Sequence, residues 1–376
     1  MHLRSLSLTQ FRSYDNLALD LSGSALHLFV GKNGSGKTNL LEAIGILSLS
    51  KSFLNAEEEH LVRWGGEFFR IRGETEADGC EQGTIEVVSQ LQPRRAKACF
   101  KNDVRIGVTD LIGHFPTVTF LPQDLELFTG PPAERRRFLD QILCQVSGEY
   151  LEALMACQKI LKQRNTLLKA IASGRASENE LSPWDAAFAR KGSLVTLKRL
   201  ELVETFGLAL GEELRALGEG WSEVRIAYER AGEGRTREVI SAELIEALIR
   251  SRERDVLLQS TGAGPHREDW TIMIDERAFQ TFGSRGQQRI AVLALIFLEA
   301  SYVELRRGER PLILLDDVFS ELDRDHQEHV LASFACNQIL MTALDVQPGA
   351  ESACIWEVGE GKVITNEASI RPAVSC

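Results

Sequence analysis

One segment near the amino terminus, Gly31-Lys32-Asn33-Gly34-Ser35-Gly36-Lys37-Thr38, constrains the fold more than any other part of the chain. It fits the pattern G-x-x-x-x-G-K-[ST], in which the backbone N–H groups of a glycine-rich turn surround phosphate oxygens. An unbroken apolar strand is expected at 26–30, and a helix is expected over about 37–49. The pattern predicts that Lys37 reaches the β- and γ-phosphates of a nucleotide and that the Thr38 hydroxyl binds Mg²⁺. The alternative is a merely flexible glycine loop, which the flanking strand and helix disfavour.

A second candidate for metal binding follows an apolar run far along the chain. Leu312-Ile313-Leu314-Leu315 leads directly into Asp316-Asp317, and such a run is typical of a strand buried on both faces. A carboxylate at the end of such a strand can hold the Mg²⁺ of a bound nucleotide. We therefore assign Asp316 to the metal, and we expect Asp317 to orient or deprotonate the attacking water. The alternative is a pair of carboxylates that caps a following helix.

A third motif, Ser284-Arg285-Gly286-Gln287, precedes an apolar helical stretch at 290–305. Ser284 suits a helix N-cap, and Gly286 allows another backbone to approach closely. Free N–H groups at a helix N-terminus favour an anion, so Ser284 and Gly286 are candidates for nucleotide contact. Any capped helix has a similar sequence. The assignment of this motif to nucleotide contact is therefore supported only by its position before the Asp316 strand.

The periodicity of the chain changes twice, which predicts an α/β fold in three parts. Residues 1–115 hold several strand-like runs and form the first lobe, which contains the glycine-rich loop. Residues 116–305 are largely helical and form a second lobe, with a polar hairpin tip at 174–180 and a return helix at 195–217. Residues 306–376 return to the first lobe with the Asp316 strand.

The charge balance limits how the chain can bind nucleic acid. Lys and Arg number 43 and Asp and Glu number 54, which gives a formal net charge of −11. DNA binding would therefore need a local basic patch. Basic clusters occur at 94–97, 135–137, 250–254 and 306–310, but each can equally be a solvated face with salt bridges. The seven cysteines lack zinc or redox spacing, and neither a secretory leader nor a membrane-length apolar stretch is recognisable. We expect a cytoplasmic protein without a membrane partner.

The glycine-rich loop, the Ser-x-Gly-Gln segment and the Asp316 strand, in this order, resemble the Walker A, signature and Walker B motifs of ABC-type ATPases. The segment Phe11-Arg12-Ser13-Tyr14 and the short helical insertion narrow the resemblance to the RecF family of recombinational repair proteins. Further segments that match the family lie at 122–125, 132–140, 264–267 and 314–323.

This resemblance implies the fold of an ABC-type P-loop ATPase head, with a mixed sheet around helices, a helical second lobe and a short helical arm. It adds Arg12 to the nucleotide-binding residues. Gln123 stands where transporters carry their Q-loop glutamine and is a catalytic candidate. Asp317 replaces the glutamate common in other ABC ATPases, and no switch histidine follows the strand at 338–341, so weak, slow ATP hydrolysis is implied. The segment 318–323 resembles the D-loop.

The implied function is that of an ATP-dependent DNA-binding repair protein. ATP and Mg²⁺ would join two subunits, with Ser284 and Gly286 of one capping the nucleotide of the other, and the homodimer would clamp DNA at gapped or stalled replication sites. The family acts in DNA replication, recombination and the SOS response to DNA damage. Its members bind single- and double-stranded DNA and, with RecR and RecO, help to load RecA. The alternative is an ABC ATPase subunit that powers a membrane transporter, which the short arm, Asp317 and the missing switch histidine disfavour.

Overall fold

The structure, a computed structural model, describes residues 1–322, 324–346 and 353–365. It divides into two compact units, one formed by Met1–Asp124 with Ile296–Cys376 and the other by Leu125–Leu295. The second change of unit falls inside helix α10 (Arg285–Arg307). The lobe limits expected from the sequence are 1–115, 116–305 and 306–376, and this division into lobes stays a prediction.

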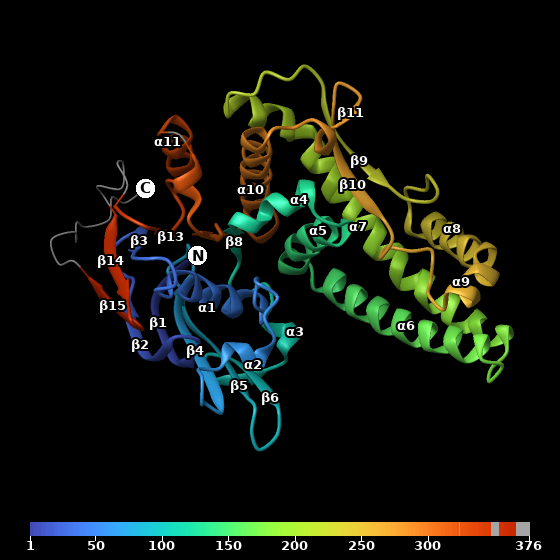
Figure 1. Ribbon diagram of the computed structural model, residues 1–376, viewed down its shortest axis with the longest axis horizontal. Helices are drawn as coiled ribbons and strands as arrows, with labels where there is room; N and C mark the ends of the chain where they lie inside the picture. Colours follow the sequence, from blue (N-terminus) through green and yellow to red (C-terminus); the bar gives the residue numbers. More distant parts are fainter. Residues whose placement is uncertain (323, 347–352, 366–376) are drawn as a thin grey trace. The chain divides into compact units, whose positions relative to one another are not determined.

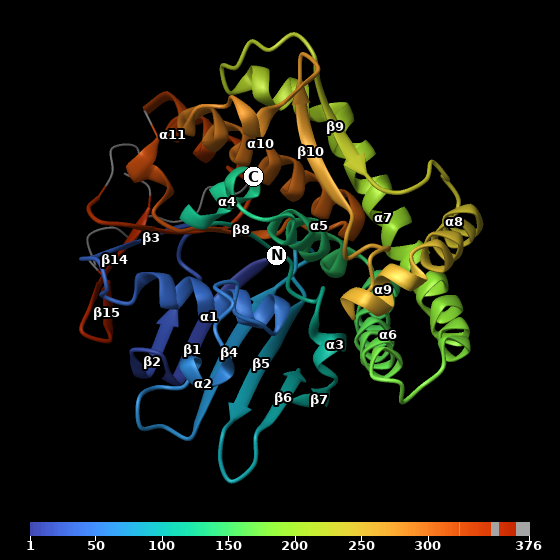
Figure 2. The same cartoon turned by 45° about the vertical axis from the view of Figure 1, so that its right-hand side comes forward.

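The first unit contains an antiparallel six-stranded sheet of order β2-β1-β4-β5-β6-β7, whose strands lie side by side in Figure 2. Buried and exposed residues alternate along β4, as expected for a sheet with one face on the core and one in water. The strands of this sheet are β1 (His2–Phe11), β2 (Tyr14–Asp20), β4 (Phe68–Glu76), β5 (Gln82–Gln90), β6 (Ala96–Lys101) and β7 (Val104–Ile106).

The second sheet of this unit has the order β15-β14-β3-β13-β12-β8. Neighbouring strands from β14 to β8 are parallel, and only β15 is antiparallel to its neighbour. The carboxyl ends of the parallel strands therefore meet at one edge, which is where α/β sheets bind ligands. These strands are β3 (Leu26–Val30), β8 (Thr117–Phe120), β12 (Leu312–Leu315), β13 (Ile339–Ala343), β14 (Cys354–Gly359) and β15 (Lys362–Thr365).

Helix α1 (Lys37–Leu49) is the common core element of the two sheets, because it contacts β1, β4 and β5 of one and β8 and β13 of the other. It is buried along almost its whole length, in keeping with a sequence that is apolar on all sides. Its bounds are those predicted from the sequence. The shorter helices of this part of the chain are α2 (Glu58–Leu61), α3 (Val108–Leu111), η1 (Pro122–Leu125), η4 (Val318–Glu321) and α11 (Arg324–Ser333).

The second unit is mainly helical. Helices α6 and α7 run side by side as the short arm, and α8 packs on α7 (Figure 1). The sheet of this unit has the order β11-β10-β9 and is antiparallel. Its elements are α4 (Glu126–Thr129), α5 (Pro132–Val146), α6 (Gly148–Ala172), η2 (Glu178–Glu180), α7 (Leu181–Ala216), β9 (Val224–Glu229), α8 (Arg237–Arg250), α9 (Arg252–Leu258), β10 (Asp269–Ile274), β11 (Arg277–Ala278) and η3 (Phe279–Thr281).

The return helix of the arm is longer than its sequence indicated. It begins at Leu181 and not at Val195, so the predicted start was wrong. Pro183 falls in the first turn, where its missing N–H removes no helical hydrogen bond, and Ser177 caps the short turn before it. Across the described residues, none of the helices combines the length and the apolar character that a membrane span needs.

A buried arginine joins three helices of the second unit. Arg164 of α6 is fully buried, and its Nε lies 2.8 Å from Asp185 Oδ1 of α7, while its NH1 group lies 2.9 Å from Asp255 Oδ2 of α9. The NH1 group also donates to the Thr261 hydroxyl at 2.8 Å. Removal of the cation would leave Asp185 with Arg252 as its remaining charged partner, at 2.7 Å. Among the described residues, the buried Asp255 would keep only the Gly262 N–H, at 2.9 Å, so this second carboxylate loses its ion pair.

Replacing Arg164 with methionine is therefore expected to destabilise the second unit by about 3–5 kcal/mol. The measurement is urea unfolding followed by circular dichroism, and Lys162→Met, an exposed change on the same helix, is the matched control. The control is expected to stay within about 0.5 kcal/mol of the wild type. Equal unfolding midpoints for the two variants would contradict a structural role for the network.

Candidate functional site

The glycine-rich loop, Asp316 and Gln123, which the sequence marks as functional, lie at the carboxyl edge of the parallel sheet. The glycine-rich loop 31–36 follows β3, and Asp316 follows β12, two strands away. Strand β13 lies between them and carries Thr342 near its end. Gln123 follows β8 on the other side of β12, in the turn η1, and is partly exposed. The strand order thus brings four separate segments to one edge.

The conformation of the loop requires glycine at three positions. A Cβ at Gly31 would lie 2.3 Å from the backbone oxygen of Val358 in β14, a separation that real side chains do not reach. Gly34 and Gly36 have φ angles of +77° and +109°, which disfavour any other residue. A Cβ at Gly36 would also collide with the side chains of Ser13 and Tyr14 at 2.8 Å.

The loop presents donors to an anion. Helix α1 begins directly after Gly36 and has no side-chain cap, so the first-turn N–H groups have no acceptor within the helix. The hydroxyl oxygen of Ser35 is buried and has no hydrogen-bond partner among the described residues. Lys32 and Asn33 are exposed at the tip of the loop. This is the donor set that phosphate oxygens require.

Lys37 supplies the positive charge of the loop. Its Nζ donates to the carbonyl oxygens of Gly31 at 2.6 Å and Lys32 at 3.0 Å, so the ammonium group lies inside the curve of the loop. The side chain is largely buried. Burial lowers the pKa of Lys37, and the nearby carboxylates of Asp317 and Asp316 oppose that shift.

The Thr38 hydroxyl and the Asp316 carboxylate are in direct contact although they lie 278 residues apart in the chain. The hydroxyl donates to Asp316 Oδ2 at 2.9 Å and lies 3.1 Å from Oδ1. Neighbouring oxygens in an octahedral Mg²⁺ shell, with bonds of 2.0–2.1 Å, are about 2.9 Å apart. The pair of oxygens therefore fits two adjacent positions around Mg²⁺, and both are the hard oxygen ligands that this ion prefers.

Asp316 is the buried carboxylate of the site, and its backbone N–H donates to Phe120 in β8 at 2.9 Å. Burial raises the pKa of Asp316, and hydrogen bonds from Thr342 and Thr38 oppose the rise. The neighbouring Asp317 has a φ of +49° and donates its N–H to Thr342 Oγ1 at 2.9 Å. Thr342 directly follows the stretch 338–341, after which the sequence shows no switch histidine, and no role was assigned to it from the sequence.

Arg12 is locked in place by a residue that sequence reasoning missed. Its Nε and NH2 groups each donate to the carboxylate of Glu42 at 2.8 Å, and NH1 donates to the carbonyl of His60 at 2.9 Å. Glu42 lies on α1, is fully buried and also accepts the Ser52 hydroxyl at 2.5 Å. The sequence held one signal for this ion pair: a glutamate within the otherwise apolar helix α1. A buried carboxylate needs a charged or hydrogen-bonding partner.

A pocket of about 600 Å³ opens beside Arg12. Ser13 and Asn39 line it on the side of α1 and are joined by a hydrogen bond of 3.1 Å. Trp64, which is fully exposed, lines it as well. The pocket therefore adjoins the first turn of α1 and offers an aromatic face, polar groups and a guanidinium. Its volume lies within the range of small-molecule sites.

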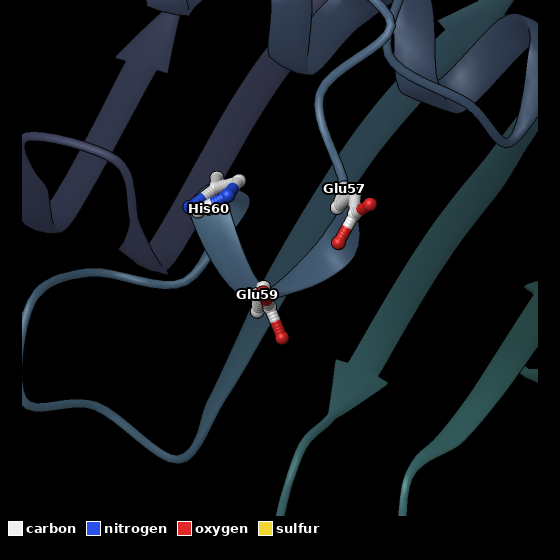
Figure 3. Close-up of side chains that lie close together, drawn as sticks. All are labelled: Glu57, Glu59 and His60. Carbon is white, nitrogen blue, oxygen red and sulfur yellow. The ribbon is translucent and has the colours of Figure 1, made fainter.

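A second oxygen-rich cluster lies at the rim of this pocket, on the short helix α2. Glu57, Glu59 and His60 are exposed and are close enough to share an ion (Figure 3). Glu59, however, already forms an ion pair with Arg95, and exposed acidic groups of this kind are common without a metal. The contact between Thr38 and Asp316 remains the better candidate for Mg²⁺.

The other predicted residues lie in the second unit or outside the described chain. Ser284 caps α10, since its hydroxyl accepts the Gln287 N–H at 3.3 Å and its N–H donates to the Gln287 side chain at 3.1 Å. This reciprocal pair is a capping box. Ser284 and Gly286 are both exposed, and a Cβ at Gly286 would meet no atom within 4 Å. Asp323 of the expected D-loop lies outside the described residues.

Comparisons of the sequence and the structure with known proteins point to one family over most of the chain. The family model of the RecF/RecN/SMC N-terminal domain matches residues 2–347. The DNA replication and repair protein RecF of Moorella thermoacetica is 36% identical over 367 residues, which cover 96% of each chain. The structure of the recombination mediator protein RecF with ATP, from the RecFOR pathway, is 30% identical, covers 97% of both chains and superposes with a TM-score of 0.90. An SMC head bound to the C-terminal winged-helix domain of ScpA, at 16% identity and a TM-score of 0.56, shares the fold. The predicted ABC-type ATPase head is thereby confirmed.

Lys37→Ala is expected to weaken ATP binding at least tenfold, because the loss of a charged hydrogen-bonding group costs roughly 1.5–3 kcal/mol or more. Isothermal titration calorimetry with ATP is the measurement. Lys51→Ala, which removes an exposed lysine that follows α1 and lies outside the loop, serves as control and should bind ATP nearly as the wild type does. Wild-type affinity in Lys37→Ala would contradict the assignment of the loop.

Proposed function

The chain belongs to the RecF family, and on this premise we propose that it is an ATP-dependent DNA-binding repair protein whose nucleotide joins two subunits into a clamp. The observation that carries the proposal is the contact between Thr38 and Asp316 at 2.9 Å beside the glycine-rich loop. It unites a phosphate cradle and a magnesium ligand pair at one edge of the sheet. The relative solved with ATP supports ATP as the nucleotide.

The nucleotide has a natural orientation in this site. Its phosphates lie in the loop 31–38, with the amide groups and Lys37 as donors. Its nucleoside lies in the pocket lined by Arg12, Ser13 and Trp64, which adjoins the first turn of α1. The aromatic face of Trp64 suits a purine base, since stacking is available to every base. Arg12, held rigidly by its ion pair with Glu42, presents the face of its guanidinium at this pocket.

Asp316 and Asp317 have different roles in the proposed slow hydrolysis of ATP. Mg²⁺, held by Thr38 and Asp316, would neutralise charge on the phosphate oxygens. Asp317 orients the attacking water or accepts its proton, and Gln123, at the same sheet edge, contributes a polar side chain on the other side of β12. A carboxylate one methylene shorter than glutamate reaches less far from the backbone, which is consistent with slow turnover.

Dimerisation explains why Ser284 and Gly286 are exposed at the start of a long helix. In the proposed dimer the N-terminus of α10 in one subunit caps the nucleotide held by the other, where its free N–H groups face the terminal phosphate. The open space at Gly286 allows this approach.

The clamp would bind single- and double-stranded DNA at gapped or stalled replication sites and act with RecR, RecO and RecA in recombination and the SOS response. The RecFOR pathway named for the solved relative supports RecR and RecO as partners, and we expect a cytoplasmic location from the proposed role. Not every basic cluster is available to DNA. Arg135 is buried and forms an ion pair with Asp269 at 2.6 Å, and Trp270 donates to its carbonyl at 2.8 Å, so its role is structural.

Ser284→Arg is expected to leave ATP binding by the monomer intact and to prevent the ATP-dependent dimer, because the bulky side chain would clash only in the closed pair. Analytical ultracentrifugation with ATP, in an Asp317→Asn background that blocks turnover, is the measurement. Ser177→Arg changes another exposed capping serine of the same unit and is the control. An ATP-dependent dimer of Ser284→Arg would refute capping in trans.

DNA binding should tighten with ATP and become more sensitive to salt, because a dimer brings two copies of each basic patch to one duplex. We expect the slope of log K against log salt concentration to be up to about twice as large with ATP as without it. Fluorescence anisotropy of labelled DNA across a salt series tests this. The slope should lose its dependence on ATP in both Lys37→Ala and Ser284→Arg. A wild-type slope that ATP does not change would leave a monomeric DNA binder in place of the clamp.

A further inference from the structure

Thr342 occupies the centre of the acidic site because of the strand order. Strand β13 lies between β3, which leads into the glycine-rich loop, and β12, which leads into the two aspartates. Thr342 is the penultimate residue of β13 and is almost completely buried. Its hydroxyl lies 2.7 Å from Asp316 Oδ1 and 2.9 Å from the backbone nitrogen of Asp317.

The direction of these two hydrogen bonds is determined by their chemistry. The Asp317 N–H can only donate, so the Thr342 oxygen accepts from it. The single hydroxyl proton of Thr342 is then directed to Asp316. One hydroxyl group therefore connects the two carboxylate-bearing residues, accepting from one and donating to the other.

The Asp316 carboxylate is consequently held from both sides. Thr38 donates to Oδ2 and Thr342 donates to Oδ1, so the plane of the carboxylate cannot rotate freely. A carboxylate that must offer one oxygen to a metal benefits from this restraint, since hydrogen-bonding partners behind a metal ligand set its orientation.

Asp317 depends on the same hydroxyl in a different way. Its φ of +49° lies in the left-handed region, which a residue with a side chain rarely adopts. The hydrogen bond from its N–H to Thr342 supports this conformation at the turn from β12 into η4. The conformation of this turn sets the direction in which the Asp317 side chain leaves the backbone.

We propose that Thr342 is a positioning residue that holds Asp316 as metal ligand and Asp317 as the residue that orients water. The proposal rests on the ATP-dependent function proposed above. A purely structural threonine would satisfy its own hydroxyl and stabilise the strand. If the threonine positions the two aspartates, its removal also changes the Mg²⁺ dependence of ATP binding and the value of kcat.

The test compares Thr342→Val, which keeps the shape and removes the hydroxyl, with Thr342→Ser, which keeps the hydroxyl. ATP binding is titrated as a function of Mg²⁺ concentration, kcat is measured at saturating Mg²⁺ and ATP, and Tm is recorded without nucleotide. Thr119→Val, a threonine of β8 in the same sheet, is the matched control. Changes behind a metal ligand typically cost 10–100-fold in metal affinity or activity.

We expect Thr342→Val to raise the Mg²⁺ requirement for ATP binding and lower kcat, each at least about tenfold, and Thr342→Ser to restore both to near the wild-type values. Thr119→Val should leave both unchanged. If Thr342→Val does not fold, Thr342→Ala is judged by the same criteria. A hydroxyl-free variant with wild-type Mg²⁺ dependence and kcat would overturn the proposal, even if its Tm falls. A wild-type chain that binds no ATP would overturn the proposed function and this inference together.

Discussion

The buried charge of Asp316 is the constraint on which the nucleotide site depends. A carboxylate at the end of an apolar strand is costly unless other groups satisfy it. Here the compensating hydroxyls come from Thr38, at the start of α1, and from Thr342, at the end of β13. Neither is near Asp316 in the sequence, so the site exists only when β3, β13 and β12 are paired in that order. Folding of the sheet and assembly of the site are one event.

Much of this arrangement could be predicted from short-range patterns. The strand at 26–30 and the helix at 37–49 were predicted correctly, because apolar runs and the glycines between them are local signals. The strand before Asp316 was predicted correctly for the same reason, while the roles of the loop and of Asp316 stay predictions. Glu42 and Thr342 were not assigned roles, because their partners lie on other elements and one chain alone does not reveal which strands become neighbours. The predicted start of α7 was about four helical turns too late, because Pro183 and the polar tip before it are turn signals that outweigh the helical residues after them.

The second unit combines apolar packing with buried ion pairs. Its helices pack through buried apolar side chains, among them Phe188, Leu248 and Phe138, which contacts Phe206 and Trp270, and buried cations reinforce the contacts. Arg164 joins α6, α7 and α9, and Arg199 of α7 donates to Asp140 of α5 at 2.9 Å and to the carbonyl of Pro265 at 2.7 Å. Ion pairs of this kind demand one geometry, whereas apolar contacts tolerate several. An arm built in this way has a defined position for each helix.

The requirement for glycine at position 31 comes from a residue that is distant in the sequence but adjacent in space. The atom that excludes a side chain there is the Val358 oxygen of β14, close to the carboxyl terminus. Strand β14 pairs with β3 and closes the sheet beside the phosphate cradle. A fragment that ends after β13 would keep the Gly-rich motif, Asp316 and Thr342, yet it would expose an unpaired edge of β3 next to the loop. Expression fragments and carboxyl-terminal fusions of this protein should therefore preserve β14, although every recognisable sequence motif lies before it.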